Sequence, residues 1–302
     1  MSSYEYVTVN VFSDVRFGGN PLAVFPDATG LTDAQMQVLA REFNYSETTF
    51  VLPPADPRHT ARLRIFTPTT ELPFAGHPNV GTGFALASRA AALPEHFTFE
   101  EGAGLVRVHI LKGADGRPNG ARVSAPQALS IGVAVPTETV AACASLAPED
   151  IATLAHDPLV ASVGIPFVIA ELASLEALAR AIPDLAAFRG AVHGIGELAG
   201  QLNLLLYVRV DGDATRLRAR VFAPLAGVLE DPATGSASAA LAALLTSLAP
   251  GDNLALAFDV FQGEELGRPS RLLATARKTP EGPVLATVAG TCVAVMCGHV
   301  EV

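Results

Sequence analysis

The sequence lacks several features that define large protein classes. It has no tryptophan, only three cysteines in 302 residues, and no apolar run of the roughly 20 residues that a membrane helix needs. Three scattered cysteines are too few for a disulfide framework. The first residues also lack the basic start and apolar core of a signal peptide, so we expect a cytoplasmic protein without membrane association.

Positive charge is scarce as well. The chain has 20 Lys and Arg against 30 Asp and Glu, a formal net charge of −10. Binding to nucleic acid or to an anionic membrane requires clustered Lys and Arg, so we expect neither partner. A small anionic substrate stays open, because it responds to local charge. The histidines and cysteines show no metal-ligand spacing and no dinucleotide-binding glycine motif follows a strand, so we expect no metal and no organic cofactor.

The sequence does contain an internal repeat. Residues 62–68 and 218–224 both read R-x-R-[IV]-F-x-P, at an offset of 156 residues. Each copy alternates polar and apolar residues, which predicts a half-buried strand with its arginines on the solvated face. A helical stretch of small residues follows each copy, through about Ala91 in the first case and about Leu248 in the second.

These matches predict a chain built from two similar halves. Half of the residues are apolar and only 17% are charged, so large cores can form. We place an N-terminal α+β half at 1–125 and a C-terminal half at 126–302, and the strand at 286–302 is able to pack back onto the first half. Chance similarity between two strand–loop–helix units is the alternative.

The first half shows clear element signals. Residues 6–12 and 22–25 predict strands, and the β-branched and aromatic residues 48–52 predict another. Between the last two, Thr32 is a good N-cap, and Gln35 completes a capping box for a helix that begins there.

Both small-residue helices begin with glycine and a polar residue. Gly76 and His77 precede Pro78, which suits the first helical position, and Gly235 is followed by Ser236, a plausible N-cap. Helix N-termini carry unpaired N–H groups and a partial positive charge, so they bind carboxylates without Lys or Arg. Glycine lets a ligand approach the backbone closely.

Acid–base side chains cluster around these helix starts. Carboxyl and imidazole groups there suit proton transfer, and Glu47 aligns with Asn203 across the repeat, so only one half carries this carboxyl. Structural alternatives stay open, because a glutamate can pair with an arginine, Asp231 can form a turn with the next proline, and His77 or Ser236 can simply cap a helix. The polar residues at strand ends and helix starts are Asn20, Glu47, His77, Glu230, Asp231 and Ser236.

At these motifs the sequence resembles the PhzF-like (phenazine biosynthesis) family, which shares the diaminopimelate epimerase fold. The resemblance implies two pseudo-equivalent domains, each a mixed sheet wrapped around a central helix, with the active site in the cleft between them. It also implies a homodimer. The matching stretches, in order, are residues 17–24, 46–51, 65–68, 71–78, 230–236 and 262–270.

The resemblance implies the site residues too. Glu47, in S-E-T-T-F, corresponds to the family's acid–base. The other matching positions are His77, Asp231 and Ser236 as catalytic side chains, and Asn20, Gly76 and Gly235 as substrate-binding residues.

The expected activity is a cofactor-independent isomerase that shifts a proton on a small carboxylated substrate, similar to trans-2,3-dihydro-3-hydroxyanthranilate isomerase. Amino-acid epimerases of this fold use two cysteines, whose positions here are Ala75 and Thr234, so two-thiol racemisation is not expected. Two alternatives remain: an epimerase or other proton-transfer enzyme for a different small acid, and a non-catalytic small-acid binding protein.

Overall fold

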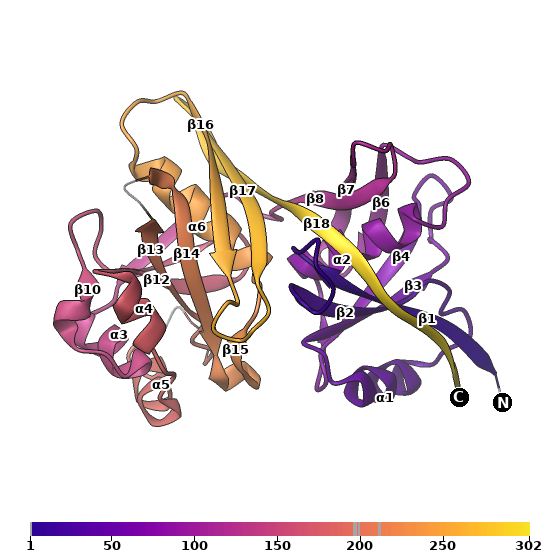
Figure 1. Cartoon of the computed structure of the whole chain (residues 1–302), viewed down its shortest axis with the longest axis horizontal. Coiled ribbons are helices and arrows are strands. Elements are labelled where there is room, and N and C mark those ends of the chain that lie inside the picture. Colours follow the sequence, from indigo (N-terminus) through magenta and orange to yellow (C-terminus); the bar gives the residue numbers. More distant parts are fainter. Residues whose placement is uncertain (1, 196–197, 199, 211–212) are drawn as a thin grey trace. The chain divides into compact units, whose positions relative to one another are not determined.

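The computed structural model describes residues 2–195, 198, 200–210 and 213–302 (Figure 1). It divides into two compact units: unit 1 comprises residues 1–126 and 288–302, and unit 2 comprises residues 127–287. Both units combine parallel and antiparallel strand pairs with helices, so the predicted α+β class is confirmed. In the described part of the chain, no helix is long and apolar enough to cross a membrane.

Unit 1 holds two helices and the first eight strands, and most of the last strand completes it. Its elements are β1 (Ser3–Val11), β2 (Asn20–Phe25), α1 (Asp33–Phe43), β3 (Glu47–Leu52), β4 (Ala61–Phe66), β5 (Glu71–Leu72), α2 (Gly76–Ala87), β6 (His96–Glu101), β7 (Gly104–Lys112), β8 (Pro118–Ser124) and β18 (Gly282–Glu301).

Unit 2 follows in chain order and contains the remaining strands. Its elements are β9 (Ser130–Ala134), α3 (Thr137–Ala144), η1 (Pro148–Asp150), β10 (Ile151–Ala152), β11 (Leu159–Ser162), β12 (Pro166–Leu172), α4 (Leu175–Arg180), α5 (Leu185–Val192), β13 (Leu204–Val210), β14 (Asp213–Ala223), η3 (Pro224–Ala226), β15 (Val228–Asp231), α6 (Gly235–Leu248), β16 (Leu254–Gln262) and β17 (Ser270–Thr279).

Helix α1 begins as its capping signals predict. The Thr32 hydroxyl accepts from the Gln35 N–H at 3.3 Å, and Oε1 of Gln35 accepts from the Thr32 N–H at 2.9 Å. These two bonds satisfy N–H groups that a helix start leaves without partners. The helix then buries one face through Met36, Leu39 and Ala40, which attaches it to the aromatic core under β2 and β3.

One succession of strand pairings occurs in each unit. In unit 1, β2–β3 is parallel, β3–β4 antiparallel, β4–β6 parallel and β6–β7 antiparallel. In unit 2, β12–β13, β13–β14, β14–β16 and β16–β17 repeat that order. Thr48 lies opposite Phe66, and Leu204 lies opposite Phe222, both 156 residues further on. The strand registers therefore confirm the alignment of Glu47 with the position before Leu204.

Helices α2 and α6 lie among the strands of their own units (Figure 1). Nearly all residues of both helices are buried, as a helix that is apolar on all sides must be. Small residues let the strands approach, because a Cβ on Gly81 would lie 2.6 Å from the side chain of Leu22. Helix α2 ends at Ala87 rather than near Ala91, since the chain beyond Ser88 is exposed and lacks packing that would extend the helix.

The arginine-bearing repeat forms strands β4 and β14, but of its four arginines only Arg62 is exposed as predicted. The side chains of Arg64 and Arg218 are 11% and 20% exposed, and both pair with acidic side chains. Arg220 is buried instead of solvated, and it pairs with Glu230 at 2.7 Å. Its Nη1 also donates to the carbonyl oxygens of Leu178 and Ala181, each at 2.8 Å. Helix α4 covers this face of the strand, so a charge at the position requires buried partners.

Candidate active site

Glu47 is the first residue of β3, beside Leu22 of the parallel strand β2. Its side chain is 16% exposed. Burial raises the pKa of the carboxyl to about 7, and a hydrogen bond from Ser46 opposes this rise. A carboxyl with a pKa near neutrality can both accept and return a proton at physiological pH, which general acid–base catalysis requires.

The imidazole of His77 lies beside this carboxyl. His77 is buried in the first turn of α2, and its Nε2 lies 3.5 Å from Oε2 of Glu47. That distance permits an ion pair when the histidine is protonated and is long for a hydrogen bond. Unit 1 thus brings an imidazole and a carboxyl together where a strand begins and a helix starts.

Asn20 is fully buried at the first position of β2. Its Oδ1 accepts from the hydroxyl of Ser46 at 3.0 Å. Ser46 also lies beside the Glu47 carboxyl and lowers its pKa, so one serine hydroxyl lies next to both Asn20 and Glu47.

Helix α2 begins without a side-chain cap. The extended residue Ala75 is the N-cap, Gly76 is the first helical residue, and Asn79 returns a hydrogen bond to the Ala75 carbonyl at 3.0 Å. Pro78 is therefore the third helical residue, not the first as predicted. It is tolerated there because N–H groups of the first turn have no intrahelical partner.

The sequence interpretation missed a second buried acid in unit 1. Both carboxyl oxygens of Glu101, at the end of β6, are inaccessible to solvent and have no hydrogen-bond partner among the described residues. Burial raises the pKa of Glu101 to about 8, and only the amide of Asn79 lowers it. The available signal was the dipeptide Glu101-Gly102, whose first residue ends a strand just as that of Gln262-Gly263 does in the second half.

In unit 2, Asp231 ends β15 and faces the start of α6. Its Oδ2 accepts from the hydroxyl of Thr234 at 2.5 Å. Thr234 keeps an extended backbone and is the N-cap of α6, and Gly235 is the first helical residue. The predicted cap at Ser236 is therefore wrong: this serine lies inside the first turn, since the chain turns into the helix two residues earlier.

Gln262 hydrogen-bonds the loop that precedes α6. It is 1% exposed, and its Nε2 donates to the carbonyl of Asp231 at 2.7 Å and to the hydroxyl of Thr234 at 3.2 Å. Its Oε1 accepts from the Thr234 N–H at 3.1 Å. The C-terminal motif thus supplies the support for the Asp231 loop, a role that its sequence did not indicate.

The predicted site residues fall into two groups, one in each unit. The two positions at which epimerases of this fold carry cysteines are Ala75 and Thr234, the N-cap residues of α2 and α6. Neither helix start therefore carries a thiol. Among the described residues, no three His, Cys, Asp or Glu side chains gather into a group that could hold a metal ion. Unit 1 contains Asn20, Glu47, Gly76 and His77, and unit 2 contains Asp231, Gly235 and Ser236.

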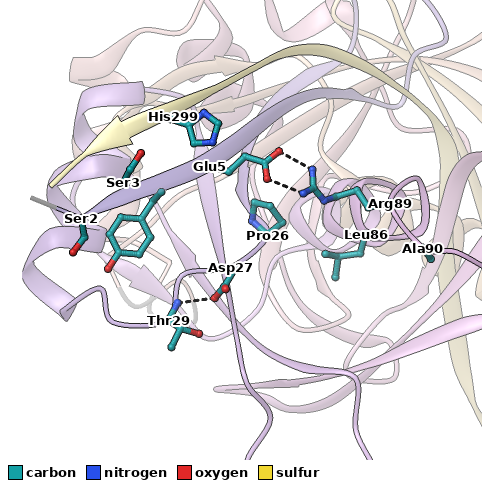
Figure 2. A pocket seen from close by; sticks show the side chains of 11 residues that line it. Ser2, Ser3, Glu5, Pro26, Asp27, Thr29, Leu86, Arg89, Ala90 and His299 are labelled. Atoms are coloured by element: carbon teal, nitrogen blue, oxygen red, sulfur yellow. Dashed lines mark hydrogen bonds and ion pairs between the residues drawn. The ribbon is translucent and has the colours of Figure 1, made fainter.

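A pocket of about 670 Å³ in unit 1 contains none of these residues (Figure 2). Its charged side chains already have partners within it. Arg89 pairs with Glu5 at 2.7 Å, and Asp27 accepts from the Thr29 N–H at 3.0 Å. This pocket therefore contains none of the predicted site residues, which lie around Glu47 in unit 1 and around Asp231 in unit 2.

Comparisons with known proteins agree on one family. The family model described as phenazine biosynthesis-like protein matches residues 9–298. An uncharacterized isomerase from Mesorhizobium japonicum is 38% identical over 280 residues, which cover 90% of each chain. Trans-2,3-dihydro-3-hydroxyanthranilate isomerase from Pseudomonas fluorescens is 34% identical over 296 residues, which cover 95% of each chain.

A solved structure extends the similarity to the fold. The crystal structure of the Bacillus anthracis phenazine biosynthesis protein of the PhzF family superposes with a TM-score of 0.86 at 25% sequence identity, over 100% of both chains. The family match and the relatives span nearly the whole sequence, including both groups of predicted site residues. The chain belongs to the phenazine biosynthesis-like (PhzC-PhzF) protein family.

Proposed function

We propose that the protein is a cofactor-independent isomerase that moves a proton on a small carboxylated substrate, with Glu47 as the acid–base. The observation that carries the proposal is the buried Glu47 carboxyl, whose pKa is about 7 and which lies 3.5 Å from the imidazole of His77. Relatives named as isomerases match the chain over 90% or more of its length, which supports this class of reaction.

The proposed reaction uses one carboxyl twice. The Glu47 carboxylate removes a proton from an activated carbon of the substrate, and the electron pair of that C–H bond becomes a new double bond as the existing one opens. The carboxylic acid then returns the proton to the carbon at the far end of the shifted system. The enzyme ends in its starting protonation state, so no external oxidant or reductant is needed.

The proposed anion site is a helix start. The substrate carboxylate binds the backbone N–H groups at one or both of the helix N-termini that begin at Gly76 and Gly235, where the helix dipole favours negative charge. Asn20 fixes the substrate next to Glu47. His77 and Asp231 orient the reacting system, and Ser236 donates a hydrogen bond.

This assignment includes a proposal about domains. We propose that residues 1–125 and 126–302 are pseudo-equivalent halves, each a mixed sheet around its central helix, with the strand 286–302 returning to the first half. On the family resemblance, we also propose a homodimer, and a scattering mass equal to one chain would contradict it. The cytoplasm is the location that we propose by default from the sequence signals.

The experiment is proton exchange in heavy water. The protein is incubated with trans-2,3-dihydro-3-hydroxyanthranilate, the substrate named for the Pseudomonas relatives, and with a panel of other small unsaturated or α-substituted carboxylic acids. Deuterium incorporation with formation of an isomer supports the proposal. Exchange that only inverts a stereocentre identifies an epimerase, and tight binding without exchange at any carbon identifies a binding protein; either result overturns the proposal.

A further inference from the structure

Glu101 and Gln262 occupy corresponding places in the two units. Arg62 lies opposite Glu100 of β6, and Glu101 is the next residue. Arg218 lies opposite Phe261 of β16, and Gln262 is the next residue. Arg62 and Arg218 are the first residues of the two repeat copies. The equivalent position in the two units is therefore occupied by a buried carboxyl in unit 1 and by a buried amide in unit 2.

The glycines that follow these residues confirm the correspondence. A Cβ on Gly102 would lie 3.0 Å from Cα of Pro73, and a Cβ on Gly263 would lie 2.5 Å from the carbonyl oxygen of Pro232. Each proline comes three residues before the first residue of its central helix. In both units, the end of the strand is thus pressed against the loop that starts the helix.

The hydrogen bonds of Gln262 fix how its amide is used. A backbone N–H can only donate and a backbone carbonyl can only accept, so Oε1 must face the Thr234 N–H and Nε2 must face the Asp231 carbonyl. Because Nε2 also donates to the Thr234 hydroxyl, that hydroxyl gives its own proton to the Asp231 carboxylate. Gln262 thus acts with one donor group and one acceptor group.

In unit 1, the corresponding place holds too many acceptors. Nδ2 of Asn79 donates to the Ala75 carbonyl, so its Oδ1 points elsewhere. That Oδ1 and both carboxyl oxygens of Glu101 are buried, with no hydrogen-bond partner in the described part of the chain. All three atoms are acceptors if Glu101 is ionised, and leaving buried polar atoms unpaired destabilises the fold.

We propose that Glu101 is held as the neutral acid, donates its proton to the amide oxygen of Asn79, and so positions the start of α2, as Gln262 positions the start of α6. A neutral carboxyl resembles a carboxamide in shape and offers one donor and one acceptor. Through Asn79 the bond reaches Ala75, the N-cap residue directly before Gly76 and His77. Glu101 is a positioning residue in this proposal, and its protonation can be tested whether or not the proposed isomerase function holds.

The charges on the surrounding elements do not oppose this state. Glu100 points to the opposite face of β6, and Arg62 on the neighbouring β4 is exposed. The residue opposite Glu101 on β7 is Gly104, which has no side chain. On α2, His77 belongs to the acid–base pair described above. Burial raises the pKa of Glu101 and outweighs the Asn79 amide, which lowers it, so the net shift favours the neutral carboxyl.

Infrared spectroscopy tests the protonation directly. The full chain with Glu47→Gln is the reference, because this change removes the other carboxyl whose pKa is near neutrality. At pH 7, we expect the carbonyl band of a protonated carboxylic acid, which disappears when Glu101→Gln is added and persists when Glu100→Gln is added instead. The Glu100 carboxyl is the matched control, since backbone N–H groups and His59 lower its pKa to about 2. No band at pH 7, or a band that survives Glu101→Gln, overturns the proposal.

Substrate turnover separates positioning from catalysis, with Glu47 left intact. Glu101→Gln keeps the donor and the acceptor, so kcat and KM should stay within about threefold of the parent. Glu101→Leu keeps neither, so the start of α2 loses support and kcat/KM should fall about tenfold or more, the equivalent of one lost buried hydrogen bond. A loss of about 10² or more in kcat for a folded Glu101→Gln protein would make Glu101 a proton donor in the reaction and overturn the positioning role.

Discussion

Nε2 of His77 lies 3.5 Å from Oε2 of Glu47, and both residues belong to unit 1. The acid–base pair is therefore assembled within one compact unit, from a strand start and a helix start. Burial of this carboxyl, rather than a charged neighbour, is the main cause of its pKa near 7. The following predictions test what that arrangement does.

Glu47→Gln should remove catalysis and leave the fold intact. The amide fills the same space but cannot take a proton, so kcat should fall by about 10² to 10⁴, the usual contribution of a general base. Isomer formation and deuterium exchange measure the loss, and circular dichroism checks the fold. Glu42→Gln is the control, because Glu42 is an exposed carboxyl at the end of α1. Near-parental turnover in the Glu47 variant would remove this residue from the reaction.

The rate should depend on pH through the same carboxyl. Glu47 acts as a base in its ionised form, and its pKa is about 7, so kcat/KM should rise with pH and level off above about 8. Initial rates in buffers of constant ionic strength measure the midpoint. A midpoint near the ordinary glutamate value of 4.5 would show that the carboxyl is not desolvated in the working enzyme.

Stability should also fall as pH rises through neutrality. The folded-state pKa of Glu47 is raised from 4.5 to about 7, so its neutral form is favoured by folding. This contribution is fully present below about pH 4.5 and is lost as pH increases through 7; the shift corresponds to roughly 3 kcal/mol. Urea denaturation from pH 5 to pH 8 should show a smaller loss for Glu47→Gln than for the parent. Identical slopes for both proteins would contradict the buried carboxyl.

Thr234→Val and Gln262→Leu should not act independently. Gln262 donates to the Thr234 hydroxyl, which donates to Asp231, so either change breaks the same series of bonds. In a double-mutant cycle on kcat/KM, the double variant should cost less than the sum of the single changes, with a coupling of about 0.5–3 kcal/mol.

The matched control for this cycle is Thr275→Val combined with Gln262→Leu. Thr275 is also part-buried in unit 2, where its hydroxyl lies 2.7 Å from that of Thr287. Its effect should add to that of Gln262→Leu. Additivity for Thr234 as well would mean that the amide does not orient the threonine hydroxyl.

Local signals in the sequence predicted much of the fold. The capping box at Thr32 and the polar–apolar alternation of residues 62–68 both depend only on residues close together in the chain. The structure contains the helix and the strand that they predict, α1 and β4. The repeat also predicted that Glu47 aligns with Asn203, and the equal registers of β3 with β4 and of β13 with β14 agree with that alignment.

The site was harder to predict where distant segments decide a residue's role. Serine is a favoured N-cap residue, which suggested Ser236. The hydrogen bond from the Thr234 N–H to Gln262 instead holds Thr234 in the extended conformation that starts the helix. Glu101 and Arg220 are charged residues on strands, and only tertiary packing buries them. The spacing of residues along the chain does not indicate that burial.

Strand β18 has a consequence for how the protein is made. Its second part pairs along the length of β1, from Val11 opposite Cys292 to Ser3 opposite Glu301, and it also pairs with β8. The ribosome releases these residues after all of unit 2 has been synthesised, although unit 2 begins at residue 127. While unit 2 is being synthesised, the nascent first unit must therefore expose an unpaired strand edge, and chaperones would be needed most during that period.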